Sequence, residues 1–227
     1  MTLAVLRDIR HLFGTARDQG RRPTCLAFAA SDFHAALRKG WTPLSCEFAF
    51  YHAQRRGGHS PHHGATLGNM LDALRQDGQP VEKEWPYLET LPSPLDRWAP
   101  PEFVGHVFRR DGERRSEQFG EIVDLLNVEV PALILMTLSD AFYAPNSAGI
   151  VIAPPGETPD PARRHAVVAV AHGTFGTEPA ILIRNSWGPA WGVDGHAWLP
   201  RSYLTPRLTR IAVLREEVDV LTDRTAA

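Results

Sequence analysis

The chain has 227 residues, of which 43% are apolar and 22% charged, and its formal net charge is -2. This composition allows a sizeable core, and it excludes both a disordered chain and a strongly basic nucleic-acid-binding protein. The chain has two cysteines and no signal-peptide pattern, and no apolar run approaches the roughly 20 residues of a membrane span. These features predict a soluble, cytoplasmic protein that binds neither membrane nor nucleic acid.

Helices are predicted throughout the first hundred residues. Residues 25–37 place apolar side chains at helical spacing, and Gly40 is expected to cap the C-terminus of that helix. Ser45 and Thr66 are expected to cap the N-termini of two further helices. A proline-rich stretch at residues 91–101 ends this helical part.

Strands are predicted in most of the remaining chain. After one more helix in residues 116–127, short β-rich runs alternate with turn formers, namely PALILMTL, GIVIA, HAVVAVAH, AILIRNSW, GHAWL and RIAVL. Helices followed by strands predict an α+β fold. We expect a single domain over residues 1–227, with a mainly helical lobe in residues 1–100 and a mainly β, antiparallel lobe in residues 101–227.

Cys25 lies where a loop rich in turn formers meets the first helix. On residue type alone, a single cysteine in a helix is more often a small buried side chain than a reactive one. At the first turn of a helix, however, unpaired backbone N–H groups and the helix dipole favour the thiolate, which is the nucleophilic form. The position of Cys25 therefore favours a nucleophile.

Two residues far along the chain have the types that such a nucleophile needs. His165 begins one β-rich run and is the candidate base, and Asn185 ends the next run and is the candidate for the group that orients the imidazole. Because neighbouring antiparallel strands run side by side, these two side chains are expected to meet opposite Cys25.

The segments around these residues resemble the papain-like cysteine peptidase family. The similarity includes ARDQG and CLAFA at the nucleophile, GQPVEKEWPY after the third helix, HAVVAVAHG at the histidine and RNSWGPAWGVDGHAWL at the asparagine. It implies a two-lobed papain-like fold, with a helical N-terminal lobe, an antiparallel β-barrel-like C-terminal lobe and a cleft between them. The similarity is to a bacterial-type, cytoplasmic member that lacks the usual disulfides.

The resemblance also implies roles for individual residues. Cys25 matches the nucleophile, His165 the base and Asn185 the orienting amide. Gln19 matches the side chain that shares the oxyanion hole with the nucleophile's own N–H, and Trp187 matches the indole that shields the histidine–asparagine hydrogen bond at the edge of the substrate site. The substrate backbone is expected to add as a short strand along Gly64, Ala65, Thr66 and Leu67.

Two positions near the nucleophile differ from the family pattern. Arg22 stands where the family usually has a cysteine, which removes a disulfide. Leu26 stands where it usually has a tryptophan, which changes the packing near the cleft.

Other residues of chemical interest are predicted to be structural. Cys46 has no base and amide motif with it and is expected to be a buried apolar side chain. The histidines of YHAQRRGGHSPHHG do not form the defined tetrahedral set of a zinc site and are expected to lie in a flexible loop. No metal and no organic cofactor are expected.

The sequence thus predicts a peptide hydrolase that acts through a thiolate–imidazolium pair and an acyl-enzyme. Two alternatives remain open at this point: an acyl-transferring ligase or cyclase of the same fold, and a catalytically silent relative that only binds peptides. Products formed with an added amine separate the first alternative, and labelling by an epoxide or vinyl sulfone separates the second.

The expected partner is a peptide or protein substrate with an acidic segment. The pairs Arg21–Arg22 and Arg163–Arg164 flank the nucleophile loop and the histidine, where positive charge would favour acidic segments. Only 18 residues precede Gln19, which is short for an inhibitory propeptide. We therefore expect that a regulatory partner protein or a fused domain restrains the activity.

Overall fold

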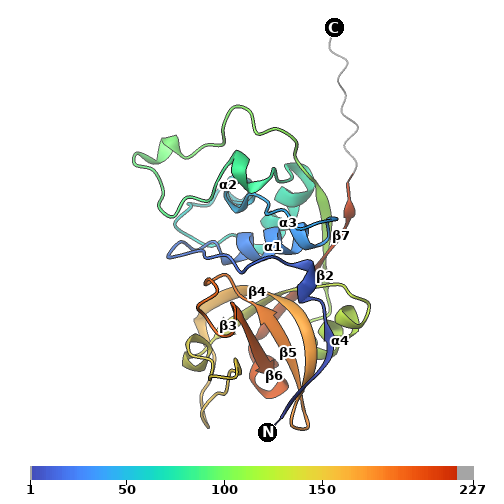
Figure 1. Cartoon of the computed structure of the whole chain (residues 1–227). Coiled ribbons are helices and arrows are strands. Elements are labelled where there is room, and N and C mark those ends of the chain that lie inside the picture. The colour runs from blue at the N-terminus through green and yellow to red at the C-terminus, as the bar shows by residue number, and fades with distance from the viewer. Residues whose placement is uncertain (1, 219–227) are drawn as a thin grey trace.

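The computed structural model describes residues 2–218, in which most helices lie in one layer and most strands in another (Figure 1). The first hundred residues contain α1 (Cys25–Ala36), α2 (Cys46–Gly57) and α3 (Leu67–Gln76). Two further helices, α4 (Phe119–Asn127) and α5 (Arg201–Leu204), accompany the strands. Single turns of 3-10 helix lie at η1 (Arg10–Leu12), η2 (Glu82–Glu84), η3 (Leu95–Arg97) and η4 (Asp140–Tyr143).

The strands form one antiparallel sheet of seven. They are β1 (Leu3–Asp8), β2 (Arg110–Arg115), β3 (Ala132–Leu138), β4 (Asp160–Phe175), β5 (Glu178–Arg184), β6 (His196–Pro200) and β7 (Leu208–Glu217). Their order is β2-β7-β3-β4-β5-β6, and β1 pairs with the far end of the long strand β4. The predicted α+β fold with an antiparallel second half is therefore confirmed.

The first three helices begin where the sequence predicts. The hydroxyls of Ser45 and Thr66 each accept the backbone N–H three residues further on, at 3.1 Å and 3.3 Å, and so cap α2 and α3. The first helix differs, because Thr24 at its N-cap makes no side-chain cap and its hydroxyl instead meets the hydroxyl of Tyr87 at 2.9 Å. The N–H groups of the first turn of α1 are thus left without a side-chain partner from the cap residue.

The alanine-rich helix α1 joins the two layers. It packs against β4 and β3, and nearly all of its residues are buried. Asp32 on α1 accepts Arg17 Nε and Arg184 Nε, both at 2.7 Å, so the loop before α1 and the last residue of β5 are tied to the same carboxylate. Because Cys25 begins α1 and Asn185 follows Arg184, this ion network fixes the position of one relative to the other.

Some local predictions were wrong. The GIVIA run makes only an isolated bridge, between Ile150 and Trp198, because a turn precedes it and the chain does not stay extended beside a partner. Helix α1 ends at Ala36, so Gly40, with φ of +75°, lies in the turn beyond the helix and does not cap it. Strands β1 and β2 have no apolar alternation and were not predicted. Among residues 2–218, no helix has the length and apolar character that a membrane span requires.

Candidate active site

A cleft of about 1050 Å³ separates the N-terminal ends of α1 and α3 from β3, β4 and β7. Its walls bring together nearly all of the residues that the sequence singles out, although they come from four separate parts of the chain. Those that line the cleft are Gln19, Cys25, Gly64, Ala65, Thr66, Leu67, His165 and Trp187. Asn185 lies buried directly behind the histidine.

Cys25 is the first residue of α1 and is half-buried at the bottom of the cleft. Backbone hydrogen bonding from the N–H groups of Ala166, Leu26 and Cys25 itself favours the thiolate at this position. Burial raises the pKa of the Cys25 thiol, and these three N–H groups act in the opposite direction. The sulfur therefore lies in a dry site that already holds donors for a negative charge.

His165 is oriented by Asn185, as the strand order predicts. The histidine lies on β4 and the asparagine directly follows β5, and the imidazole Nε2–H donates to Asn185 Oδ1 at 2.7 Å. The same amide oxygen accepts the N–H of Ser186 at 2.8 Å, which identifies it as the oxygen of the amide. The proton thus lies on Nε2, and Nδ1 is the ring nitrogen left to act as a base.

Burial also controls the charge of the imidazole. It lowers the pKa of His165 to about 4, and the hydrogen bond to Asn185 opposes this shift. Taken separately, the thiol and the imidazole are therefore both neutral near pH 7. Proton transfer between them creates two opposite charges at once, and each charge then stabilises the other.

Aromatic rings cover the histidine. The ring centroid of Trp187 lies 4.8 Å from that of His165, and the centroid of Phe142 lies 5.7 Å from it. Tyr143 stacks on the outer face of the indole at 5.3 Å. These rings keep water from the hydrogen bond between histidine and asparagine, which is the role that the sequence predicts for Trp187. Sequence reasoning missed Phe142 and Tyr143, because nothing in DAFYAP indicates that η4 packs on this site.

The amide of Gln19 is held in a fixed orientation. Its Oε1 accepts the hydroxyl of Ser186 at 2.7 Å, and one Nε2 hydrogen goes to the carbonyl of Arg22 at 2.8 Å. The second Nε2 hydrogen has no partner among the described residues, and the side chain lines the cleft near Cys25. Gln19 therefore has one oriented N–H available for an oxyanion.

The stretch of residues 64–67 forms the opposite wall of the cleft. Within residues 2–218, the backbone N–H and C=O groups of Gly64 and Ala65 make no hydrogen bond. Thr66 uses its hydroxyl to cap α3, and Leu67 is buried at the start of that helix. An extended backbone with unpaired groups beside a nucleophile is a place where a peptide can pair as a strand.

The two arginine pairs differ from the prediction. Arg22 does not face the cleft: its guanidinium forms a buried ion pair with Glu47 at 2.6 Å, because a fully buried carboxylate needs a cation. Arg21 is exposed and does not line the cleft, whereas Arg163 and Arg164 do. The prediction that Arg22 reads acidic substrates was therefore wrong.

The other residues of chemical interest lie away from the cleft. Cys46 is completely buried at the start of α2, and burial raises its pKa well above 9.0. The prediction that all four histidines of this run lie in a loop was wrong for His52, which lies on α2 and contacts Asp77 at 3.3 Å; His59, His62 and His63 follow the helix and are exposed. The loop is held in place by Gln54, whose amide Nε2 donates to two of its carbonyls.

Comparison with known proteins gives the same picture. A model of a family described as papain family cysteine protease matches residues 63–210, a segment that contains His165 and Asn185. Cysteine proteinase 3 from Dictyostelium discoideum is 23% identical over 192 residues, which cover 82% of this chain and 55% of that protein. Cysteine proteinase 1 from Entamoeba histolytica is 24% identical over 196 residues, which cover 79% and 58%. The chain thus spans little more than half the length of these relatives.

A solved structure extends the similarity to almost the whole chain. The crystal structure of xylellain, a cysteine protease from Xylella fastidiosa, matches with a TM-score of 0.76 at 23% identity, over 94% of this chain and 87% of that one. At this identity the match shows the fold, and the predicted papain-like fold is confirmed. In the present chain the usual disulfide cysteine is replaced by Arg22, and both Cys25 and Cys46 are free thiols.

Proposed function

The chain belongs to the papain family of cysteine proteases, and from that membership we propose that it hydrolyses peptide bonds with Cys25 as the nucleophile. The match to the family model begins at residue 63 and so contains the base and the amide but not the nucleophile. The observation that carries the proposal is the convergence of Cys25, His165 and Gln19 in one cleft, with Asn185 behind the imidazole.

In the proposed reaction, Nδ1 of His165 takes the proton of the Cys25 thiol, and the thiolate attacks the scissile carbonyl carbon. The C–N bond breaks as the imidazolium gives this proton to the leaving amine, and a thioester with Cys25 remains. His165 then takes a proton from water, the hydroxide attacks the thioester, and the carboxylic acid leaves as the thiol is restored. Throughout, Asn185 keeps Nε2 protonated and Nδ1 facing the sulfur.

The oxyanion that forms in both steps needs donors in place beforehand. The backbone N–H of Cys25 and the free Nε2 hydrogen of Gln19 are suited to this, because the latter amide cannot rotate without breaking its bonds to Ser186 and Arg22. One such donor is worth about 3 kcal/mol of transition-state stabilisation in enzymes where it has been removed. The bonds to Gln19 therefore support catalysis indirectly, through orientation.

The charge state of the resting pair has a test of its own. In Cys25→Ala, His165 is expected to titrate with a pKa of about 4, because burial disfavours the imidazolium. In the wild type, a thiolate beside the ring would keep it protonated at pH 7. Ring-nitrogen NMR shifts in the two proteins measure this difference. A neutral His165 ring in both proteins would mean that the Cys25 proton moves to His165 only during attack. The free protein would then hold no thiolate–imidazolium pair, but the proposed hydrolysis would stand.

Labelling and product analysis test the proposed activity. A peptidyl vinyl sulfone should form one adduct per chain, and peptide mapping should place it on Cys25. A peptide ester or amide substrate with added amine separates hydrolysis from transfer: mass spectrometry should show the free acid as the main product. A dominant amide product would instead favour the ligase or cyclase alternative. If the vinyl sulfone forms no adduct and no peptide is turned over, the chain is a silent peptide-binding relative.

We also place the protein in the cytoplasm. This proposal is supported by two free thiols and by an ion pair, Arg22 with Glu47, at the position where the family usually has a disulfide cysteine. Fractionation of source cells with an antibody against the chain tests it, and recovery from an oxidising compartment would contradict it.

A further inference from the structure

The charged side chains that line the cleft are all positive. They are Arg114, Arg163, Arg164 and Arg210, and no aspartate or glutamate is among the described residues that line it. The whole chain, in contrast, has a formal net charge of -2. A concave site with charges of one sign and low-dielectric walls concentrates ligands of the opposite charge.

Two of these arginines have no carboxylate to neutralise them. Arg163 contacts two aspartates, and Arg210 contacts a glutamate at 2.8 Å. Within residues 2–218, neither Arg114 nor Arg164 has a carboxylate within 4.0 Å; Arg164 makes only a long contact of 3.4 Å to a backbone carbonyl. Both are exposed to solvent in the cleft and are therefore available to a ligand.

The register of the sheet places three of the arginines on one face. Arg210 lies opposite Leu135, which in turn lies opposite Ala166 on the next strand. Arg164 is two residues before Ala166 on β4. Arg114 on β2 lies opposite Ala212 on β7, which is two residues after Arg210. Residues opposite each other in antiparallel strands, and residues two apart, point to the same face. That face contains Leu135 and Ala166, which both line the cleft.

Arg114 also reaches the wall where a substrate backbone would pair. A Cβ placed on Gly68 would lie 3.7 Å from Arg114 Nη2, so the guanidinium extends from β2 to the first turn of α3. Gly68 directly follows the stretch of residues 64–67. The cation thus lies at the α3 end of this stretch, in the same cleft as the unpaired backbone of Gly64 and Ala65.

The direction of the substrate follows from the chemistry of the proposed function. His165 must reach the leaving amine, so the leaving part lies on the side of the cleft covered by Trp187. The acyl part then runs the other way, along residues 64–67, and its side chains alternate between the two sides of the strand that they form. One of them must point at the face of the sheet that contains Leu135, Arg114 and Arg164.

We propose that Arg114 forms a carboxylate-binding subsite that selects an aspartate or glutamate side chain on the acyl side of the scissile bond, with Arg164 adding to the positive charge of the cleft. The proposal rests on the proposed peptidase activity and names its substrate class. Arg114 is the specificity-determining residue, because it is unpaired and adjoins the substrate backbone. Charge-assisted hydrogen bonds from the Arg114 guanidinium should favour glutamate over glutamine by about tenfold in kcat/KM.

The test uses a neutral peptide that the wild-type protein cleaves, with glutamate or glutamine placed in turn at each of the four positions before the scissile bond. The quantity measured is the ratio of kcat/KM for the glutamate peptide to that for the glutamine peptide. One position should give a ratio of about ten at low salt, falling as salt screens the charges. In Arg114→Glu that ratio should drop below one, and a lysine peptide should become the better substrate.

A matched control separates a local subsite from a general field. Arg21→Glu makes the same change in net charge at an exposed arginine outside the cleft, and it should leave the ratio unchanged. If both variants lower the ratio equally, the effect is long-range and the subsite is wrong. Should Arg114→Glu fail to fold, Arg114→Gln tests the same point. Its ratio of kcat/KM for the glutamate and glutamine peptides should lie between one and the wild-type ratio.

Failure of the subsite is distinguishable from failure of the activity. A wild-type ratio near one at every position, with normal cleavage of the neutral peptide, overturns the subsite and leaves the peptidase intact. Absence of cleavage and of labelling at Cys25 overturns the proposed function itself.

Discussion

Helices α1 and α2 are a natural pair for comparison, because each has 12 residues and each begins with a cysteine. Cys25 begins α1 and lines the cleft, whereas Cys46 begins α2 and is fully buried. Residue type and position in the helix are therefore the same in the two cases. What differs is how the first turn of each helix is occupied, and that difference decides which thiol is suited to react.

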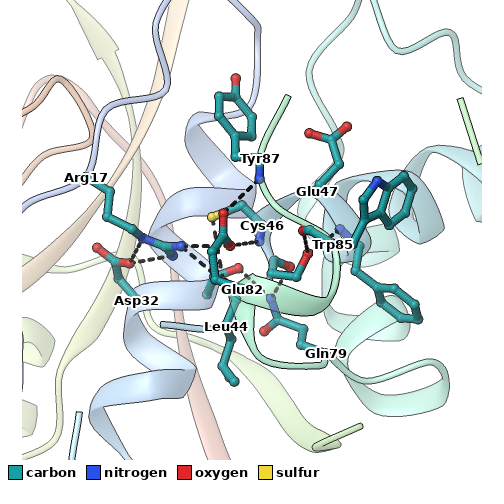
Figure 2. A network of polar contacts seen from close by, with 12 residues as sticks. Arg17, Asp32, Leu44, Cys46, Glu47, Gln79, Glu82, Trp85 and Tyr87 are labelled. Atoms are coloured by element: carbon teal, nitrogen blue, oxygen red, sulfur yellow. Dashed lines mark hydrogen bonds and ion pairs between the residues drawn. The ribbon is translucent and has the colours of Figure 1, made fainter. Parts of the chain in front are cut away.

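The first turn of α2 is already satisfied. Ser45 caps it, and the N–H of Cys46 donates to Glu82 Oε2 at 3.2 Å (Figure 2). The same carboxylate contacts Arg17 at 3.3 Å, and Asp32 lies on the other side of that arginine. A thiolate at Cys46 would lie in a dry site beside two carboxylates and the Arg17 guanidinium. Burial raises the pKa of this thiol well above its usual value, and the carboxylates add to the rise while Arg17 opposes it.

The first turn of α1 is left open. Thr24 directs its hydroxyl to Tyr87 and caps nothing, so backbone N–H groups of this turn stay available, and they oppose the rise in the pKa of the Cys25 thiol that burial causes. No carboxylate lines the surrounding cleft among the described residues, and His165 provides a base. The comparison teaches that the helix terminus alone does not activate a cysteine: its donors must be unoccupied, and a base must be in reach.

The largest effect that this comparison predicts is the loss of Cys25. In Cys25→Ala, peptide turnover and labelling by a vinyl sulfone should both fall to background, because the only suitably placed sulfur is gone. The fold should remain, since the residue is half-buried and alanine is a good helix former. Full labelling of this variant, with the adduct on Cys46, would reverse the assignment of the two thiols.

Part of the placement of these residues follows from local pattern in the sequence. The cap residues Ser45 and Thr66 act on N–H groups three residues away, so pattern alone places α2 and α3. His165 and Asn185 come from consecutive strands, and consecutive antiparallel strands are neighbours in the sheet. The positions of the base and amide relative to each other thus follow from their order in the chain.

The rest depends on contacts between distant segments, which no local pattern encodes. Arg22 meets Glu47 only because the fold brings the nucleophile loop against α2, and the charge of each residue alone would suit an exposed surface. Arg114 belongs to a strand, RDGERR, that has no apolar alternation to reveal it, so its place in the cleft could not be foreseen. The packing of the η4 rings on His165 is another contact between segments far apart in the chain, so the sequence does not reveal it.

The second prediction concerns the orientation of the base. Asn185→Ala removes the acceptor of the Nε2 hydrogen bond, so the imidazole can rotate and present Nδ1 less often to the sulfur. We expect kcat to fall by about tenfold to a hundredfold, less than for the loss of Cys25, because the thiol and the base both remain. Steady-state kinetics on one peptide measures the change.

The chain offers a matched control for this variant. His172 Nε2 and Asn127 Oδ1 form a second pair of the same type, at 2.8 Å, outside the cleft. Asn127→Ala should therefore leave kcat within about twofold of the wild type, since surface pairs of this kind act on stability alone. Equal losses in both variants would remove Asn185 from the mechanism.

The third prediction removes a carboxylate charge from the first turn of α2, where α1 has none. Glu82→Gln removes the charge that faces Arg17 and the N–H of Cys46. The free energy of unfolding should fall by about 1 to 3 kcal/mol, because a largely buried arginine loses a carboxylate. Cys46 should still resist labelling in the folded protein, since it gains neither a base nor access. Urea denaturation and labelling under native conditions measure the two effects.

Glu84→Gln is the control for that experiment, because Glu84 lies in the same turn, η2, and its only ion pair among the described residues is a long contact of 3.9 Å to Lys83. Its stability should stay within about 0.5 kcal/mol of the wild type. If Cys46 became reactive in Glu82→Gln at a rate above that of global unfolding, loss of the facing carboxylate would be sufficient for reactivity without a base, and the conclusion drawn from the two helices would need revision.

The smallest effect is expected for Cys46 itself. Cys46→Ala removes one sulfur atom from a fully buried position, so the cost is the lost packing and the weak contact of the thiol with the carbonyl of Leu44 at 4.0 Å. A loss of about 1 kcal/mol in the free energy of unfolding is appropriate for so few atoms. The initial rate on a peptide substrate and the labelling of Cys25 should match the wild type, because no atom of Cys46 lines the cleft. A folded Cys46→Ala protein that had lost its activity would show that the two helices are coupled in catalysis, and α2 could then no longer serve as the inert member of the pair.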